Sequence, residues 1–367
     1  MFPMSWIRRV GGQIRLPEGR PPRLLVVQIA GIGDLVLATP ALSALRDRYP
    51  EARIDVLTSP RAADLLVGHP TVSNLYAFNI GRYRNPLSLM LPGSLLDLRR
   101  QTRPLREACY DALLSLNNVS TKRGAITLGL LLRTLDVPAW AGRNTDGRMP
   151  LFDEEVRESL ADPSPEVLVK LKVAALLGAE SSPRPLVLPV DREERERAQR
   201  TLGGTGEWAA ILPGANVASK RWPAERFGEV AAALHGRGMK ILLLGTGEDV
   251  AAADVVSGAV EGDVLSLVGK VTLRETAALL QACRIVVTND TGPMHIAAAV
   301  GTPLVALFAS VNIHRFRPWT ADSRCRTLTS PCGNEYPESD PRAMEASLRC
   351  VGVPEVLSAV DEMLEEA

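Results

Sequence analysis

The sequence predicts an α/β protein built from two Rossmann-like domains in tandem. Apolar, β-rich runs alternate with helical segments along most of the 367 residues, and this alternation is interrupted once and then restarts. Strands that alternate with helices form parallel sheets covered by helices on both faces, because the crossovers between parallel strands are right-handed. At about 150 residues per domain, the length also suits two domains.

The first half begins with a strand at residues 23–30, RLLVVQIA, an apolar run that ends at a glycine. Such a run is typical of a strand buried in a parallel sheet. Leucines recur at helical spacing in residues 34–48, and Pro50 marks the end of that expected helix. We expect further strands at 52–59 and 110–116, and further helices at 60–68 and 121–135.

The pattern changes between residues 178 and 206. GAESSPRPLVLPV is rich in Pro and Ser, and the charged, helix-forming run DREERERAQRTL follows it. Such a stretch is typical of a domain boundary. We therefore expect an N-terminal domain of residues 1–180, a C-terminal domain of residues 181–345 and a closing amphipathic helix within residues 346–367.

The alternation restarts after this boundary. Strands are expected at 207–212, 239–244, 284–290 and 303–309, and helices at 223–235, 272–283 and 291–300. Thr272 and Glu275 have the spacing of a capping box at the start of one of these helices.

Charge excludes some functions and suggests a partner. The 42 basic and 42 acidic residues cancel, which argues against a general nucleic-acid binder. Residues 1–150 nevertheless carry 20 basic and 11 acidic residues, and the rest of the chain has the opposite imbalance. This asymmetry suggests that the N-terminal half meets an anionic partner. A chance imbalance of solvated charges remains the alternative.

The N-terminal residues contain no apolar core of signal-peptide length. Five cysteines in a long chain fit a reducing compartment, so we predict a cytoplasmic protein. Cys325, Cys332 and Cys350 cluster without a CxxC pair. Unpaired thiols are therefore favoured over a metal site, and no metal is expected.

Ligands bind beyond the carboxyl ends of strands in open parallel sheets, and this rule selects four loops. The first is residues 30–35, AGIGDL, with Gly33 and Asp34. A dinucleotide site would need glycine where Val36 stands, although Asp55 has the position of a ribose-binding acid. A carboxylate at a helix start also repels phosphate. Asp34 therefore suits a general base or a simple helix cap.

The second loop, residues 212–223, follows an expected strand. Gly214 gives a turn, and Asn216, Ser219 and Lys220 follow it. Small polar residues with a mobile positive charge suit a diphosphate. A solvated surface lysine is the alternative for Lys220.

The third and fourth loops carry acidic and hydroxyl groups. In the third, Glu248 is placed to accept hydrogen bonds from sugar hydroxyls, or to favour the helix dipole. The fourth, TNDTGPMH, ends a strand and opens a helix, and such a helix start can hold a diphosphate. Its candidate ligand-binding residues are Asp290, Thr291, Gly292 and His295.

Three segments together resemble glycosyltransferase family 9, the ADP-heptose:lipopolysaccharide heptosyltransferase family. They are GIGDLVLATPALSALRDRYP, PGANVASKRWPAERF and TNDTGPMHIAAAVGTPLVALF. Their order and spacing match, and the similarity covers most of residues 23–310. The resemblance implies a GT-B architecture, in which two Rossmann-like domains face each other across a cleft.

The resemblance also implies roles for the loop residues. Asp34 corresponds to the general base, Lys220 to the lysine that steadies the donor diphosphate, and Glu248 to the acid that binds the donor ribose. The remaining donor-binding positions are Asp290, Thr291, Gly292 and His295, with Gly214, Asn216 and Ser219 matched less clearly. The family inverts the anomeric carbon. No cofactor is expected, since Lys220 and the helix start can stand in for a metal ion.

The expected partners are a nucleotide-sugar donor, most simply ADP-heptose, and an anionic lipid-linked glycan of the lipopolysaccharide core. Gly33, Arg99, Arg100 and Arg103 are the candidate acceptor-binding residues. Apolar residues between the arginines suit peripheral contact with the cytoplasmic face of the inner membrane. A solvated helix face is the alternative for these arginines.

Three other functions remain open at this point. They are a transferase with another nucleotide sugar or with a capsule or protein acceptor, a non-catalytic sugar-nucleotide-binding module, and an NAD(P)-dependent oxidoreductase. Asp34 and Val36 argue against the last of these.

Overall fold

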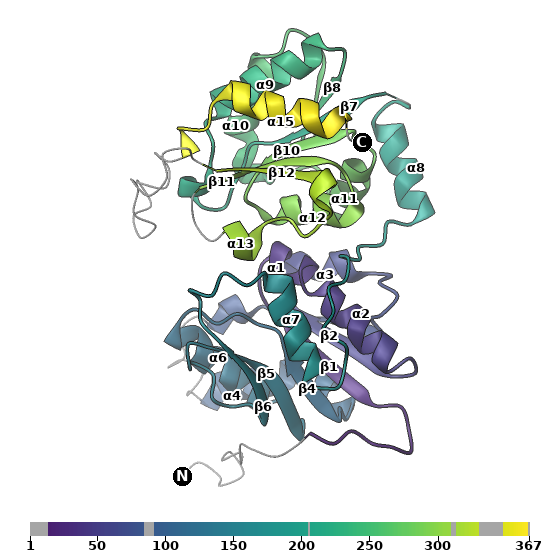
Figure 1. Cartoon of the computed structure of the whole chain (residues 1–367). Helices are drawn as coiled ribbons and strands as arrows, with labels where there is room; N and C mark the ends of the chain where they lie inside the picture. The colour runs from purple at the N-terminus through teal and green to yellow at the C-terminus, as the bar shows by residue number, and fades with distance from the viewer. Residues whose placement is uncertain (1–13, 84–91, 205, 310–312, 330–347, 366–367) are drawn as a thin grey trace. The chain divides into compact units, whose positions relative to one another are not determined.

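The computed structural model describes residues 14–83, 92–204, 206–309, 313–329 and 348–365. The chain divides into two compact units, with unit 1 ending at Arg184 and unit 2 beginning at Pro185. Each unit contains one six-stranded sheet in which all neighbouring strands are parallel (Figure 1). The predicted α/β class with two Rossmann-like sheets is confirmed.

The sheet of unit 1 has the strand order β3-β2-β1-β4-β5-β6. Its strands are β1 (Arg23–Gln28), β2 (Arg53–Thr58), β3 (Asn74–Ala77), β4 (Ala112–Ser115), β5 (Ala139–Thr145) and β6 (Glu154–Glu158). The order reverses between β1 and β4. The loops that leave the carboxyl ends of these two strands therefore diverge, which is where open α/β sheets bind ligands.

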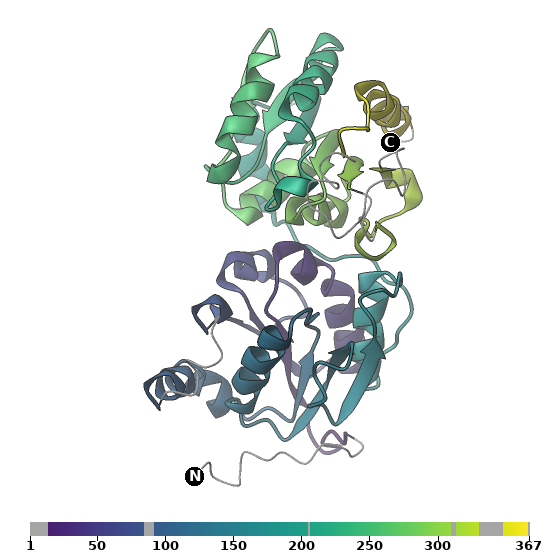
Figure 2. The ribbon, with the colours of Figure 1, turned by 90° about the vertical axis from the view of Figure 1, so that its left-hand side faces the viewer.

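Helices cover both faces of this sheet (Figure 2). α2 (Thr39–Arg48) packs against α7 (Glu166–Ala175) on one face. On the other, α4 (Pro92–Gln101), α5 (Arg103–Glu107) and α6 (Lys122–Arg133) bury leucines against Leu25 and Val27. Leu24 and Val26 of the same strand are also fully buried, because successive side chains point to opposite faces that are both covered.

The helix expected at 34–48 is wrong as a single element. The structure has two helices there, α1 (Ile32–Val36) and α2, with the break at Leu37 and Ala38. Pro40 cannot donate a backbone hydrogen bond, so it suits the first turn of a new helix. The Thr39 hydroxyl donates to the Val36 carbonyl at 2.8 Å and fixes this break. The helix expected at 60–68 is shorter, α3 (Pro60–Ala63), and continues as a 3₁₀ turn.

Unit 2 repeats the topology of unit 1 with the strand order β12-β11-β10-β7-β8-β9. Its strands are β7 (Trp208–Leu212), β8 (Lys240–Leu243), β9 (Val264–Ser266), β10 (Ile285–Asn289), β11 (Leu304–Phe308) and β12 (Cys325–Thr329). The order reverses between β7 and β10, so the loops after these two strands flank the switch point of unit 2.

Two layers of helices cover this second sheet as well. α9 (Ala224–Gly236), α10 (Val250–Gly258) and α15 (Val353–Glu365) share one apolar cluster with the sheet. α8 (Arg192–Thr201) packs on α11 (Leu273–Gln281), which also contacts α12 (Gly292–Val300). The predicted capping box of Thr272 and Glu275 is confirmed at the start of α11.

Within the described ranges, no helix is long and apolar enough to cross a bilayer. Cys109 and Cys283 are free thiols, and Cys325 is not disulfide-bonded. Cys350 is disulfide-bonded, so the expectation of unpaired thiols is wrong for this residue. Cys332 lies outside the described residues.

Candidate functional site

The switch point of unit 2 brings together two of the predicted site residues. Lys220 ends a short 3₁₀ turn in the loop after β7, and Asp290 comes directly after β10. The Lys220 Nζ and the Asp290 carboxylate form an ion pair. The Lys220 side chain keeps 41% of its surface exposed, whereas Asp290 keeps 12%. The lysine is therefore held at the strand ends but remains reachable by a ligand.

Asn289 holds the loop that carries Lys220. Its Nδ2 donates to the carbonyls of Pro213 at 2.9 Å and Gly214 at 3.3 Å, and its Oδ1 accepts from the Trp222 backbone at 3.0 Å. The buried amide thus ties both ends of the loop to β10. This role of Asn289 was not predicted, although an Asn at the end of a buried strand, directly before Asp290, is a signal for it in the sequence.

Gly214 is required by close packing. A Cβ atom at this position would lie 2.1 Å from the Asp249 carboxylate. Asp249 in turn accepts hydrogen bonds from the backbone N–H and the hydroxyl of Thr246, both at 2.8 Å. Asp249 therefore packs the loop after β8 against the loop after β7. Close packing against Asp249 therefore requires a glycine at this position.

The start of α12 presents backbone N–H groups beside the ion pair. Thr291 is the N-cap residue, has extended backbone angles, and makes no side-chain capping bond. Gly292 begins the helix and Pro293 follows. Free N–H groups and the helix dipole at such a start favour an anion.

His295 lies one turn inside this helix and is only 5% exposed. Burial lowers the pKa of His295 to about 4; Asp290 opposes this shift and Lys220 adds to it. The imidazole is therefore neutral at physiological pH. Its Nδ1 is buried and has no hydrogen-bond partner among the residues that the structure describes.

The other predicted donor-site residues differ in exposure. Ser219 is 2% exposed, and its buried hydroxyl has no hydrogen-bond partner in the described part of the chain. Asn216 and Glu248 are exposed on the loops after β7 and β8. Among the described residues, neither is hydrogen-bonded to the Lys220–Asp290 pair.

Asp34 is the third residue of α1 and is half-buried. Burial raises the pKa of its carboxyl, and so does the negative charge of Glu166. Lys170, Arg143 and a hydrogen bond from the Gly31 backbone oppose this rise. The net pKa is above the ordinary aspartate value, which brings this carboxyl nearer to the range useful for a general base.

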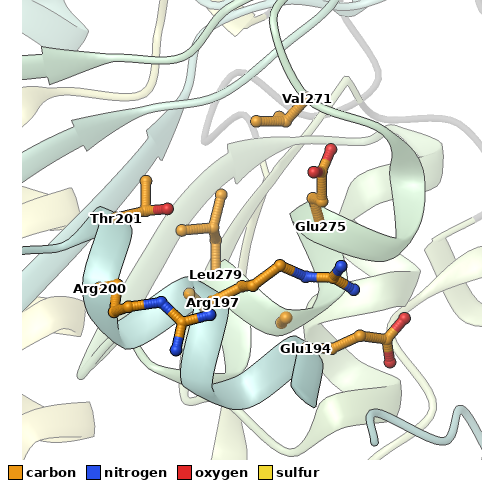
Figure 3. Close-up of a pocket in the computed structure, with 9 residues that line it drawn as sticks. Glu194, Arg197, Arg200, Thr201, Val271, Glu275 and Leu279 are labelled. Carbon is orange, nitrogen blue, oxygen red and sulfur yellow. The ribbon is translucent and has the colours of Figure 1, made fainter.

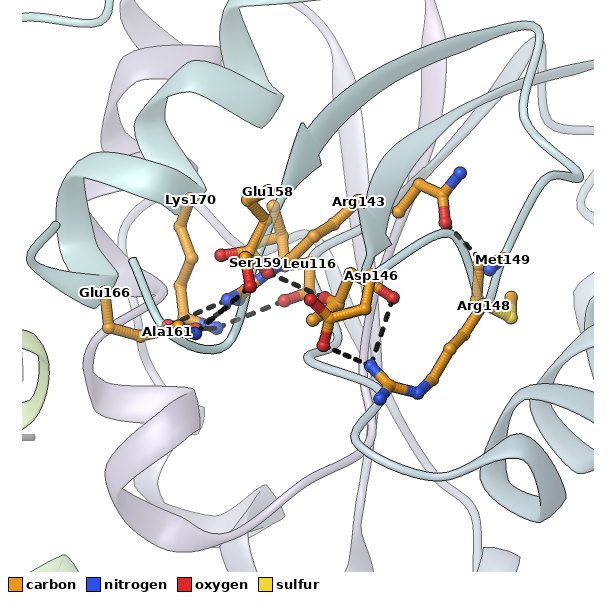
Figure 4. Close-up of polar contacts among 12 residues, drawn as sticks. Leu116, Arg143, Asp146, Arg148, Met149, Glu158, Ser159, Ala161, Glu166 and Lys170 are labelled. Atoms are coloured by element: carbon orange, nitrogen blue, oxygen red, sulfur yellow. Dashed lines mark hydrogen bonds and ion pairs between the residues drawn. The ribbon is translucent and has the colours of Figure 1, made fainter. Parts of the chain in front are cut away.

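Three of these influences on Asp34 belong to a buried ion network in unit 1 (Figure 4). Arg143 pairs with Glu158 at 2.5 Å and, through both terminal nitrogens, with Glu166. The Lys170 Nζ lies 3.1 Å from Glu166 Oε1. This network was not predicted from the sequence.

The predicted acceptor residues lie in unit 1; the three arginines are exposed and Gly33 is half-buried. Arg99 and Arg100 are in the last turn of α4, and Arg103 begins α5 and pairs with Glu107 at 2.6 Å. Gly33 is in α1, directly before Asp34. These arginines can therefore reach a ligand in solution.

Asp55 is a structural residue. It is completely buried within β2 and accepts hydrogen bonds from the Tyr110 hydroxyl at 2.6 Å, from Arg53 at 3.0 Å and from Asn74 at 3.0 Å. A ribose-binding acid must face a ligand beyond the strand end, which Asp55 does not do. The dinucleotide interpretation is therefore wrong.

A pocket of about 180 Å³ lies elsewhere in unit 2, between α8 and α11 (Figure 3). Its walls include Glu194, Arg197 and Glu275, and it contains none of the predicted site residues. Among the described residues, no group of three or more His, Cys, Asp or Glu side chains could hold a metal ion.

Replacing His295 by Gln should remove an acid-sensitive part of the stability. The pKa of His295 is about 4 in the folded protein, against 6.5 for an ordinary histidine, so the unfolded chain binds a proton first as the pH falls. Wild-type stability should therefore drop as the pH falls from 6.5 to about 4, by about 2–3 kcal/mol. Urea unfolding of both proteins at neutral and acidic pH measures this. The same pH dependence in both would show that folding does not depress the imidazole's pKa.

The model of glycosyltransferase family 9 (heptosyltransferase) matches residues 98–343. Lipopolysaccharide heptosyltransferase 3 of Escherichia coli is 27% identical over 341 residues, covering 90% of this chain and 96% of the relative. The structure of E. coli ADP-heptose LPS heptosyltransferase II superposes with a TM-score of 0.74 at 25% identity, covering 94% and 100% of the two chains. A family 9 glycosyltransferase from Veillonella parvula gives a TM-score of 0.78 at 22% identity, covering 96% and 99%, and so shares the fold. The chain therefore belongs to glycosyltransferase family 9 and is a heptosyltransferase-like enzyme.

Proposed function

We propose that this enzyme transfers a heptose from ADP-heptose to an acceptor in the inner core of lipopolysaccharide, with inversion at the anomeric carbon. The observation that carries the donor half of this proposal is the Lys220–Asp290 pair at the switch point of unit 2, beside the open start of α12. The names of the relatives, which are lipopolysaccharide heptosyltransferases, support the choice of sugar and acceptor.

Unit 2 is the proposed donor-binding unit. A diphosphate is held by the Lys220 ammonium and by the backbone N–H groups at Thr291 and Gly292. Glu248, exposed on the neighbouring loop, accepts hydrogen bonds from the ribose hydroxyls. Asp290 and the neutral His295 complete the site beneath the phosphates, and Asn216 and Ser219 line the loop before Lys220.

The reaction is a single displacement. The acceptor hydroxyl oxygen attacks the anomeric carbon of the heptose while the bond from that carbon to the diphosphate oxygen breaks. Asp34 takes the hydroxyl proton, and ADP leaves with the bonding electron pair. The leaving diphosphate gains negative charge in the transition state, which Lys220 and the start of α12 stabilise. The raised pKa of Asp34 makes it a stronger proton acceptor once it is ionised.

A transfer assay tests this function. The purified protein is incubated with ADP-heptose and with lipopolysaccharide from strains whose cores are truncated at successive positions. ADP release is measured, the mass of the glycan product is determined by mass spectrometry, and its anomeric configuration is determined by NMR. UDP-sugars, capsule glycans and proteins serve as alternative donors and acceptors. Transfer to one of these alone would replace the proposed substrate, and nucleotide-sugar binding without any transfer would indicate a non-catalytic module.

Unit 1 is the proposed acceptor-binding unit. Replacing Arg99, Arg100 and Arg103 together by Gln should raise the acceptor KM and flatten its dependence on ionic strength. Exposed charge contacts are screened over about 8–10 Å at ordinary salt, so the wild-type KM should itself rise with salt. The donor KM should change little, since the donor is assigned to the other unit. Both constants are measured at low and high salt. If both KM values rise equally, or if neither rises, the arginines do not bind the acceptor and simply form a solvated helix face.

A further inference from the structure

Lys170 is a completely buried lysine whose ammonium group is fully occupied. Its Nζ donates to Gln28 Oε1 at 3.0 Å and to the Leu116 carbonyl at 3.2 Å, and it pairs with Glu166 Oε1 at 3.1 Å. A buried charge is costly unless it is paired and hydrogen-bonded, and here the ammonium group has two hydrogen-bond acceptors and an ion-pair partner.

The surrounding network holds this lysine in place (Figure 4). Glu166, one turn earlier on α7, is also fully buried and receives the Arg143 guanidinium through two nitrogens. Arg143 in turn pairs with Glu158, which also accepts a hydrogen bond from the Thr145 hydroxyl at 2.7 Å. Two positive and two negative charges thus balance within the network.

The network lies at the ligand-binding edge of unit 1. Gln28 is the last residue of β1 and Leu116 follows the last residue of β4, so Lys170 joins the carboxyl ends of the two strands that flank the switch point. The helix that carries Asp34 starts four residues after Gln28. Lys170 is therefore a fixed positive charge at the end of β1, the strand from which the loop of the proposed base begins.

We propose that Lys170 is a positioning residue for the transfer reaction, whose buried positive charge keeps the Asp34 carboxyl ionised and ready to accept the proton of the acceptor hydroxyl. The inference rests on the proposed function, in which Asp34 is the general base.

The charges around Asp34 support this role. Burial makes the pKa of Asp34 rise, Lys170 is the strongest influence that lowers it, and Glu166 and Arg143 act with opposite signs. α3, which also contacts α1, contributes the exposed Arg61. Without Lys170, Glu166 would retain its negative charge near Asp34, and the carboxyl would hold its proton to a higher pH.

Two variants with opposite expected effects test the inference. Lys170→Met removes the positive charge and should raise the pKa of Asp34 by about one unit, since a close opposite charge shifts a carboxyl by about 1–3 units. Glu166→Gln removes a negative charge, retains one acceptor oxygen for Arg143 and Lys170, and should lower the pKa of Asp34. Lys172→Met, at an exposed lysine on the same helix, is the matched control and should change nothing.

The experiment reads the pKa directly and through catalysis. Carboxyl-¹³C-aspartate NMR of the full chain gives the pKa of Asp34, with its signal assigned by its loss in Asp34→Asn. The acid limb of the pH profile of kcat/KM gives its catalytic effect, and circular dichroism confirms folding of each variant. If Lys170→Met does not fold, the pKa of Asp34 in Glu166→Gln is the test of the inference.

The expected result is that the pKa of Asp34 measured by NMR rises in Lys170→Met and falls in Glu166→Gln. In each variant the acid limb of the pH profile should move by the same amount as this pKa. An unchanged pKa of Asp34 in the folded variants would overturn the inference and leave the proposed function standing. A shifted pKa with an unshifted acid limb would instead remove Asp34 from the role of base, and with it the catalytic role of Lys170.

Discussion

Asp34→Asn should keep the fold and the donor affinity but lower the rate of transfer by about 10²–10⁴-fold, the usual effect of removing a general base. The amide has nearly the shape of the carboxylate and can still accept the hydrogen bond from the Gly31 backbone. It cannot take the proton of the acceptor hydroxyl. Steady-state transfer assays give kcat, and titration calorimetry with the nucleotide sugar gives the donor Kd.

A stability measurement serves as the control for this variant. The pKa of Asp34 is raised in the folded protein, so the folded chain binds a proton more readily than the unfolded chain. Wild-type stability should therefore fall as the pH rises from the ordinary aspartate pKa through the raised one. The amide does not ionise, so Asp34→Asn does not lose this stability and should melt at a higher temperature than wild type at neutral pH. Transfer within threefold of the wild-type rate would exclude Asp34 as the base.

The strands that the sequence predicted are the ones with uninterrupted apolar runs. β1, β7 and β10 are buried on both faces, so every residue of their interiors is apolar or small. The edge strands β3 and β6 were not predicted, because both are partly exposed and neither has an apolar run: β3 is the short NLYA, and β6 is the charged EEVRE.

β5 was missed for another reason. It is an interior strand, but Gly142 and Arg143 interrupt its apolar run. A Cβ at position 142 would lie 2.4 Å from the Phe152 ring, so this glycine is required by packing. Arg143 is buried there because Glu158 and Glu166 surround it. Both glutamates come from later in the chain, so the residues next to Arg143 in the sequence do not indicate that it is buried and paired.

The same limit applies to the candidate site. Strand-end loops can be found from sequence, since a buried strand followed by Gly or Asp marks the edge where ligands bind. Glu166 and Lys170, in contrast, have the i, i+4 spacing of an ordinary solvated helix pair. Only the packing of α7 over β4 and β5 turns this pair into a buried network.

Lys220→Ala should weaken nucleotide-sugar binding and also slow the chemical step. The ammonium attracts the diphosphate of the bound donor and stabilises the charge that this group gains as it leaves. A charged hydrogen bond of about 1.5–3 kcal/mol corresponds to roughly 10–100-fold in each constant. Donor Kd by calorimetry and single-turnover rates at saturating donor separate the two effects.

The Lys220–Asp290 pair makes the choice of controls important. Removing the lysine leaves Asp290 without its ion-pair partner, so part of any loss could come from a displaced loop rather than from a missing phosphate contact. Lys220→Arg retains the charge next to Asp290 but offers a planar group in place of a mobile point charge. Partial recovery of donor binding in Lys220→Arg, with wild-type melting in that variant, is expected from direct phosphate contact. The exposed Lys270 of the same unit provides a matched Ala control. Unchanged donor Kd and unchanged turnover in Lys220→Ala would make Lys220 an ordinary surface lysine paired with Asp290.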